Sequence, residues 1–217
     1  MPGRFGTLGS SVVDEVCPGV YVCSARAVRS LDGLIERGVG LIINSAASVT
    51  PNPESKVVLT SSGSDAPQVL TPEATVAVVD ASIAAKASGA VATVWLKLQD
   101  DPTQILAPYF EPVARIIGSA VRAGVGVVVH CLMGVSRSVS LVAGYMIINR
   151  VGGLTSLQSV LAQIKEGRSV AQPQPTFCIE LFKLERKLLQ SEETAATKVS
   201  DDIPTPTEAA VDQQRAS

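Results

Sequence analysis

The chain is poor in the residue types that build metal sites, disulfide frameworks and membrane spans. Of its 217 residues one is histidine and four are cysteines, and the cysteines are scattered without a secretory signal. A Cys/His zinc site and a disulfide framework are therefore not expected. The longest strongly apolar runs, residues 125–129 and 139–148, are well short of the ~20 residues that cross a bilayer. No membrane span is expected either.

Charged residues are also scarce, at 18% of the chain, and 18 Lys and Arg against 20 Asp and Glu give a formal charge of −2. This composition lacks the basic surface with which proteins bind nucleic acid or anionic membranes. The N-terminus has no apolar signal core, and Pro2 stands where N-myristoylation needs glycine. We therefore expect a cytoplasmic protein, with the nucleus also accessible, that uses no metal or other cofactor. The oligomeric state is left open.

The length suits one domain with tails, and the 4% of aromatic residues leave Val, Ile, Leu and Ala to build its core. Residues 191–217 contain no aromatic residue and carry six acidic against two basic side chains. We expect a flexible N-terminus over residues 1–10, a single domain over 11–190 and a disordered acidic tail over 191–217.

Apolar runs of strand length alternate with segments whose apolar residues recur at helical spacing. Strands are expected at residues 19–22, 40–44, 92–98 and 124–130. Helices are expected at residues 24–37, 110–121, 138–149, 157–164 and 177–188, with a less distinct one from 71 to about 88. Thr155 and Gln158 form a capping-box pattern before one of them. This alternation predicts an α/β fold with a central, mostly parallel sheet flanked by helices.

A cysteine followed six positions later by an arginine occurs twice, as Cys23 with Arg29 and as Cys131 with Arg137. The spacing alone is weak, because 11 arginines produce it readily by chance. Only Cys131 follows the single histidine, His130, and lies between an apolar strand and an apolar helix. Cys23 is interpreted as a small residue in a strand, and Arg29 as a charge on a solvated helix face.

The segment from Cys131 to Arg137 has the properties of an oxyanion site. A turn from a strand into a helix directs backbone N–H groups and the positive helix end at one point. Gly134 permits the tight curvature, and the planar guanidinium of Arg137 matches two phosphate oxygens. The positive electrostatic potential of these groups also favours a thiolate, because helix termini can lower a cysteine pKa from about 8.5 to ~3.5–7.5. Cys131 is therefore expected to be a nucleophile at neutral pH.

The sequence HCLMGVSRS, residues 130–138, resembles the signature loop of the cysteine-dependent protein tyrosine phosphatases, and GVSRS is similar to their dual-specificity branch. The segments CPGVYVCSARAV, QDDPTQILAPYF and GYMIINRVGGLTSLQSVLAQIKEGR extend the resemblance. It covers about residues 12–190 apart from 49–91, a stretch longer than the family needs and interpreted as an insertion. Cys23 stands where many members have glycine, and QPQPTF replaces the usual Pro-Asn pair before the last helix.

The resemblance implies a protein tyrosine phosphatase-like fold and a phosphatase of phosphotyrosine and phosphoserine or phosphothreonine in protein substrates. Cys131 would form a phosphocysteine. The phosphate would be held by Arg137 and by the loop residues Leu132, Met133, Gly134, Val135 and Ser136.

The family mechanism also implies a carboxylic acid upstream of the loop. Both Asp100 and Asp101 are candidates, and the family spacing of nine residues before the first aromatic, Tyr109, favours Asp100. Asp101 is then interpreted as a turn-capping residue. By the same resemblance His130 would brace the loop and help to lower the thiol pKa, and Ser138 would stabilise the leaving thiolate.

Two alternative functions remain at this point. One is a phosphatase of lipid or RNA phosphates, although Leu132, Met133 and Val135 leave the loop without a lysine for a second phosphate. The other is a non-catalytic module that binds phosphate. The choice between tyrosine-only and dual specificity depends on pocket depth, which the sequence does not give.

Overall fold

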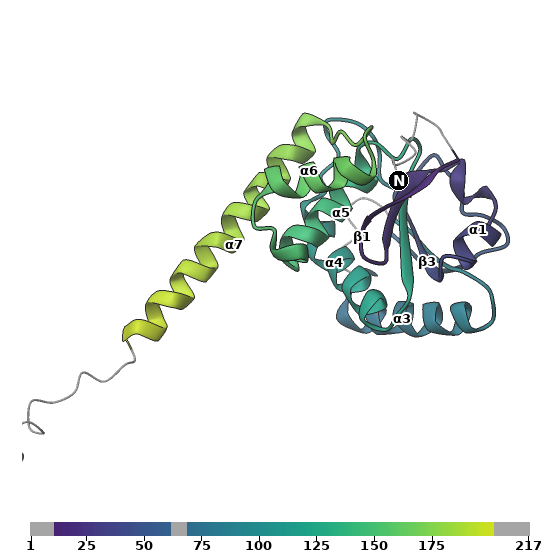
Figure 1. The fold of residues 1–217 in the computed structure, drawn as a ribbon, viewed down its shortest axis with the longest axis horizontal. Helices are drawn as coiled ribbons and strands as arrows, with labels where there is room; N and C mark the ends of the chain where they lie inside the picture. Colours follow the sequence, from purple (N-terminus) through teal and green to yellow (C-terminus); the bar gives the residue numbers. More distant parts are fainter. Residues whose placement is uncertain (1–10, 62–68, 202–217) are drawn as a thin grey trace, which may run out of the picture. The chain divides into compact units, whose positions relative to one another are not determined.

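A six-stranded sheet forms the centre of the computed structural model, which describes residues 11–61 and 69–201. The strands are β1 (Val13–Cys17), β2 (Val20–Ser24), β3 (Val39–Asn44), β4 (Lys56–Thr60), β5 (Ala92–Trp95) and β6 (Gly126–Cys131). Their order is β1-β2-β6-β3-β5-β4 (Figure 1). Only the β1–β2 pair is antiparallel, and every other neighbouring pair is parallel. The expected α/β fold with a mostly parallel sheet is confirmed.

Helices cover both faces of this sheet. They are η1 (Ala27–Arg29), α1 (Asp32–Ile35), α3 (Pro72–Ala87), α4 (Ala107–Arg122), α5 (Arg137–Ile148), η3 (Val151–Gly153), α6 (Leu157–Gly167) and α7 (Pro175–Asp201). The short α1 lies on one side of the sheet, and α4, α5 and α6 lie on the other (Figure 1). Among the described residues no helix has the length and apolar character that crossing a membrane requires.

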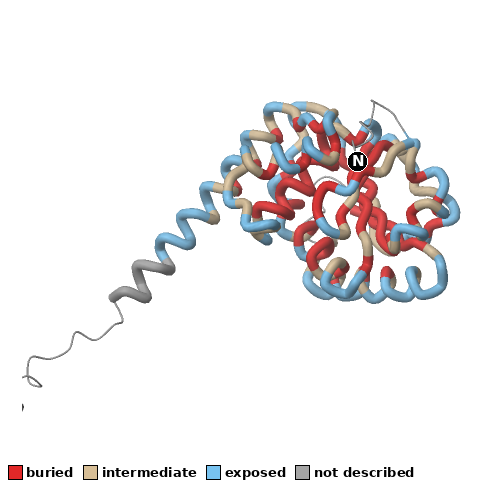
Figure 2. Tube along the Cα trace, in the orientation of Figure 1, coloured by how far each residue is buried: buried red, intermediate tan, exposed pale blue. Residues whose placement is uncertain are grey.

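The middle strands β3 and β6 are buried on both faces, as their apolar runs predict (Figure 2). Successive side chains of a strand alternate between the faces. Cys23, Ile42 and Val128 accordingly share one apolar cluster with the residues of η1 and α1. The opposite side of β6 is covered by α4 and α5. Because parallel strands end at the same edge, β6 carries Cys131 to the carboxyl edge of the sheet, where α5 begins.

The helix expected over residues 24–37 is wrong as one continuous element. It is divided into η1 and α1, with Ser30 in an extended conformation between them. Asn52 explains the break, because its Nδ2 donates to the carbonyl oxygens of Val28 and Arg29 at 2.9 and 3.0 Å. A continuous helix would use both carbonyls for its own i to i+4 bonds.

Two further boundaries differ from the sequence expectation. The strand expected to reach residue 98 ends at Trp95, and Lys97 two residues later has a φ of 32°, a conformation that extended chain does not adopt. The cap of α6 is Ser156, whose hydroxyl accepts from the Ser159 amide at 3.2 Å, and not the Thr155 pattern.

The segment 49–91 contributes an edge strand and a helix. Strand β4, which was not expected, pairs with β5, and α3 contacts β3, β5 and α4. Thr71 caps α3 by accepting from the Ala74 amide at 3.2 Å, and Pro72 occupies the first turn. The described part of this segment is therefore built into the sheet and its helical layer. Residues 62–68 lie outside the described residues.

The expectation of a disordered tail beginning at residue 191 needs correction. Helix α7 continues to Asp201, so residues 191–201 are helical. The chain divides into two compact units, Met1–Glu185 and Arg186–Ser217. The remainder of the predicted tail, 202–217, and the predicted flexible N-terminus, 1–10, lie outside the described residues.

Candidate active site

The loop from Cys131 to Arg137 connects the buried strand β6 to the buried helix α5. Gly134 sits in its middle with a φ of 68°, a region that favours glycine. A Cβ on Gly134 would lie 2.2 Å from the carbonyl oxygen of Cys23 and 2.7 Å from Nη2 of Arg168. The loop can thus pack against β2 only if this position is glycine.

The Cys131 thiol lies inside this loop and is almost fully buried. The Gly134 amide donates to its Sγ at 3.1 Å, and the Ser138 hydroxyl donates at 3.4 Å. Burial raises the thiol pKa, but hydrogen bonds from the Ser138 side chain and amide, the Arg137 charge and the Val135 amide outweigh it. The net effect is a pKa below the ordinary value, which favours the thiolate.

The other three cysteines differ from Cys131. Burial raises the pKa of Cys17 to about 12 and raises the pKa of Cys23 further, while Cys178 is shifted upward by partial burial. Cys23 is fully buried in β2, and Arg29 is exposed. As expected from the sequence, Cys23 is a buried strand residue and Arg29 an exposed charge. The raised pKa keeps the Cys23 thiol protonated.

Arg137 begins α5, and its guanidinium is buried next to the segment 98–100. Nη1 donates to the Leu98 carbonyl at 2.9 Å, and Nη2 contacts Oδ2 of Asp100 at 3.2 Å. Nε is buried and has no hydrogen-bond partner among the described residues. A buried donor without a partner costs free energy, and an oxyanion bound in the loop would satisfy it.

The two adjacent aspartates have different environments. The Asp100 carboxylate contacts Arg137 and is 45% exposed. The Asp101 carboxylate instead accepts from the amide and hydroxyl of Thr103 at 2.8 and 2.5 Å, and these bonds lower its pKa. The structure therefore brings Asp100, and not the Asp101 side chain, to the loop, and gives Asp101 the geometry of a turn cap.

His130 does not act on the thiol as a charge. It is buried, and its Nδ1 lies 3.1 Å from the Cys131 carbonyl oxygen, which can only accept, so Nδ1 carries the proton. Burial lowers its pKa to about 4, and the charge of Arg137 acts in the same direction. At neutral pH the imidazole is uncharged. The expectation that it braces the loop fits this contact, but the lowering of the Cys131 pKa comes from other groups.

The loop's outer side is held by an ion pair that the sequence analysis missed. Arg168 is fully buried, and it donates from Nε to the Gly134 carbonyl at 2.5 Å and from Nη2 to the Met133 carbonyl at 3.0 Å. Its Nη1 contacts Oδ2 of Asp14 in β1 at 2.5 Å. The arginine thus ties the loop of residues 131–137 to the edge strand of the sheet.

The chain after α6 adds further contacts to the same loop. The backbone N–H of Gln172 donates to the Val135 carbonyl oxygen at 2.8 Å, and the backbone N–H of Gln174 donates to the Ser136 hydroxyl at 3.2 Å. Of the loop side chains, Leu132 and Met133 are turned to solvent, being 48% and 39% exposed. The described residues contain no cluster of three or more metal-ligating side chains.

Comparisons with known proteins place the chain among phosphatases in sequence and in fold. The family model described as "Dual specificity phosphatase, catalytic domain" matches residues 20–187. Human dual specificity phosphatase 28 is 30% identical over 174 residues, which is 80% of this chain and 78% of that protein. The tyrosine-protein phosphatase yvh1 of Schizosaccharomyces pombe is 33% identical over 101 residues, 43% of this chain and 30% of that protein. The crystal structure of human DUSP28 superposes with a TM-score of 0.63 at 26% identity, covering 85% of this chain and 99% of that one.

Proposed function

The chain belongs to the dual specificity phosphatase family, a family of hydrolases, and we propose that it dephosphorylates tyrosine and serine or threonine residues of proteins through a phosphocysteine. One observation carries this proposal. A thiol with a lowered pKa and a buried guanidinium with a free Nε belong to one loop at a helix start. Together they offer a nucleophile and a site for the phosphoryl oxygens.

In the proposed first step the Cys131 thiolate attacks phosphorus in line with the leaving oxygen. The sulfur–phosphorus bond forms as the bond from phosphorus to the substrate oxygen breaks. Arg137 and the loop amides hold the three equatorial oxygens, whose charge is stabilised without reorganisation of water. Asp100 donates a proton to the departing oxygen, so that a neutral hydroxyl leaves.

In the proposed second step water hydrolyses the phosphocysteine. Asp100, now a carboxylate, accepts a proton from the attacking water, and the sulfur leaves as a thiolate. The Ser138 hydroxyl, which donates to Sγ at 3.4 Å, stabilises that thiolate. The products are inorganic phosphate and the enzyme with its acid reprotonated.

Phosphate release from a panel of substrates tests the proposal. With EDTA present, we expect many turnovers on a phosphotyrosine peptide and on matched phosphoserine and phosphothreonine peptides. A phosphoinositide and a capped RNA complete the panel and should be poorer substrates. Binding of the phosphopeptides without turnover would identify a phosphate-binding module instead. Faster release from the lipid or the RNA would overturn the assignment to protein substrates.

Substitutions of the two aspartates are expected to have different effects on kcat in the same assay. Asp100→Asn should lower kcat on a phosphotyrosine peptide by about 10²-fold, because tyrosine is a poor leaving group with a pKa near 10 and needs the proton. Asp101→Asn is the matched control and should retain kcat within about tenfold, since its loss affects only the turn. If the Asp101 variant alone loses turnover, the acid has been misassigned.

A further inference from the structure

A hollow of about 400 Å³ opens next to the phosphate loop. It lies between η1 and the segment 48–53, and Leu132 of the phosphate loop forms part of its wall. Leu132 follows Cys131 directly and is 48% exposed. The hollow therefore borders the loop that carries the proposed nucleophile.

Hydrogen bonds keep the two walls of this hollow together. Asn52 Nδ2 on one wall donates to the carbonyl oxygens of Val28 and Arg29 on the other, as described above. The Asn52 side-chain oxygen accepts from the Glu54 amide at 2.8 Å, and its backbone carbonyl accepts from the Ser55 hydroxyl at 2.8 Å. The hollow is thus formed before any ligand arrives, which reduces the entropy cost of binding.

The lining has an apolar part and one charge. Val28, Val49, Pro51, Pro53 and Leu132 supply apolar surface, and the only charged side chain among the described lining residues is the exposed Arg29. Arg29 has no ion-pair partner among the described residues, so its guanidinium is available to a ligand.

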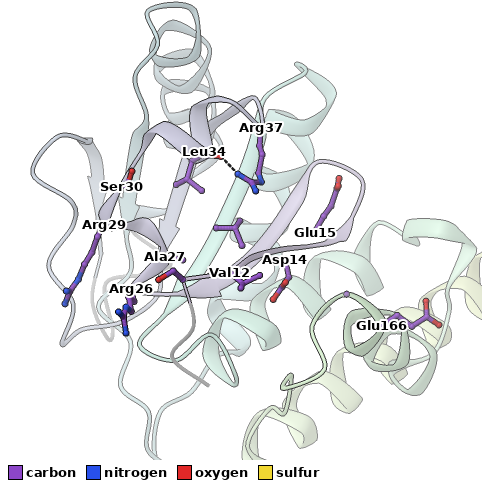
Figure 3. Close-up of a pocket in the computed structure, with 14 residues that line it drawn as sticks. Val12, Asp14, Glu15, Arg26, Ala27, Arg29, Ser30, Leu34, Arg37 and Glu166 are labelled. Carbon is purple, nitrogen blue, oxygen red and sulfur yellow. Dashed lines mark hydrogen bonds between the residues drawn. The ribbon is translucent and has the colours of Figure 1, made fainter. Parts of the chain in front are cut away.

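Arg29 also borders a second, larger hollow of about 650 Å³ (Figure 3). In that view Arg26 and Arg29 stand at one end, and Glu15 and Glu166 stand at the other. Arg37, the third arginine of this lining, stands on the side of Glu15 instead. At the end shared with the smaller hollow, the described lining of the smaller hollow contains no acidic residue that would oppose Arg29.

We propose that the hollow at Leu132 binds the polypeptide segment beside the phosphorylated residue of a substrate, and that Arg29 favours an aspartate or glutamate in that segment. This inference rests on the proposed function. A phosphoryl group held at Cys131 places the flanking residues of its peptide at the mouth of the loop, because an extended chain advances only about 3.3–3.6 Å per residue. The apolar wall accepts side-chain carbons, and the single charge complements a carboxylate.

Phosphotyrosine peptides that differ only in flanking residues test the inference. One set carries Asp or Glu on either side of the phosphotyrosine, and its partner carries Asn or Gln at the same positions. For the wild type, kcat/KM should be about two- to fivefold higher for the acidic set, because KM is lower for these peptides. The effect is small because an exposed charge pair contributes little binding energy. The advantage should shrink as ionic strength rises.

Arg29→Glu should reverse the preference and change the ratio of the two kcat/KM values by ~10-fold, because repulsion replaces attraction. Its turnover of p-nitrophenyl phosphate, which has no flanking residues, should stay within about twofold. Arg122→Glu is the matched control with the same change in charge. Arg122 is an exposed residue at the end of α4 that precedes β6, at the edge of the sheet opposite the loop, so its preference should equal that of the wild type.

The outcomes separate the two proposals. If the wild type does not hydrolyse p-nitrophenyl phosphate or any phosphopeptide, the proposed function is wrong. If it hydrolyses them but shows no preference for the acidic set, or if Arg29→Glu keeps the wild-type preference, the function stands and the role of Arg29 is wrong. An equal loss of preference in both arginine variants would indicate a general effect of net charge and would also overturn it.

Discussion

Replacing Cys131 by Ser is expected to lower kcat on phosphopeptides by roughly 10⁴-fold or more, the scale seen when a covalent nucleophile is removed. A serine hydroxyl at this position is not ionised at neutral pH, whereas the surroundings of the thiol lower its pKa. The change is nearly isosteric, so binding should persist. Steady-state kinetics and isothermal titration with a phosphotyrosine peptide would measure the two effects separately.

Two observations accompany this prediction as controls. Cys178→Ser, at a thiol whose pKa is shifted upward, should keep turnover within about twofold. Iodoacetate at pH 7 should modify Cys131 before the other thiols, because the thiolate is the reactive species and Arg137 attracts the reagent's carboxylate. A Cys131→Ser enzyme with a tenth or more of the wild-type turnover would refute the covalent mechanism.

The second large effect is expected on stability. Arg168→Met should lower the free energy of unfolding by about 3–5 kcal/mol, because it leaves the buried Asp14 carboxylate without its partner. It also removes the donors to the carbonyl oxygens of Met133 and Gly134. Urea unfolding followed by circular dichroism would measure the loss.

A double-mutant cycle with Asp14→Leu tests whether the ion pair is the cause. The double variant should be more stable than the sum of the two single losses predicts, by about 0.5–3 kcal/mol, because no unpaired charge remains. Arg122→Met, at an exposed position, should change stability by only about 0.5 kcal/mol or less. A loss below about 1 kcal/mol for Arg168→Met would show that the pair does not stabilise the fold.

The part of the site that is contiguous in sequence could be predicted from the sequence. Residues 130–138 combine a buried strand, a glycine turn and a helix start, and local chain geometry is enough to place the Cys131 thiol and the Arg137 guanidinium at one end of α5. The distinction between Asp100 and Asp101 needed the family spacing, because both side chains belong to the same short loop. Their contacts with Arg137 and Thr103 then separate them.

The missed features all depend on contacts between distant parts of the chain. Asp14 and Arg168 are 154 positions apart, and nothing local marks either as buried. Asn52 explains the break between η1 and α1 through a hydrogen bond to Arg29, which lies more than twenty residues earlier in the chain. The edge strands β1 and β4 contain charged and polar residues, so their apolar sequence pattern is weak. Their strand conformation depends on pairing with a neighbouring strand, which the sequence does not show.

The contact between Asp100 and Arg137 bears on which solutes the loop can admit. An incoming anion competes with a carboxylate that already lies 3.2 Å from Nη2. Chloride or another singly charged ion would only exchange one negative charge for another at that nitrogen. A dianionic phosphate monoester brings a second charge and enough oxygens to reach Nε and the loop amides as well. While Asp100 is ionised, exchange at Nη2 would therefore favour a dianionic phosphate monoester over a monovalent anion.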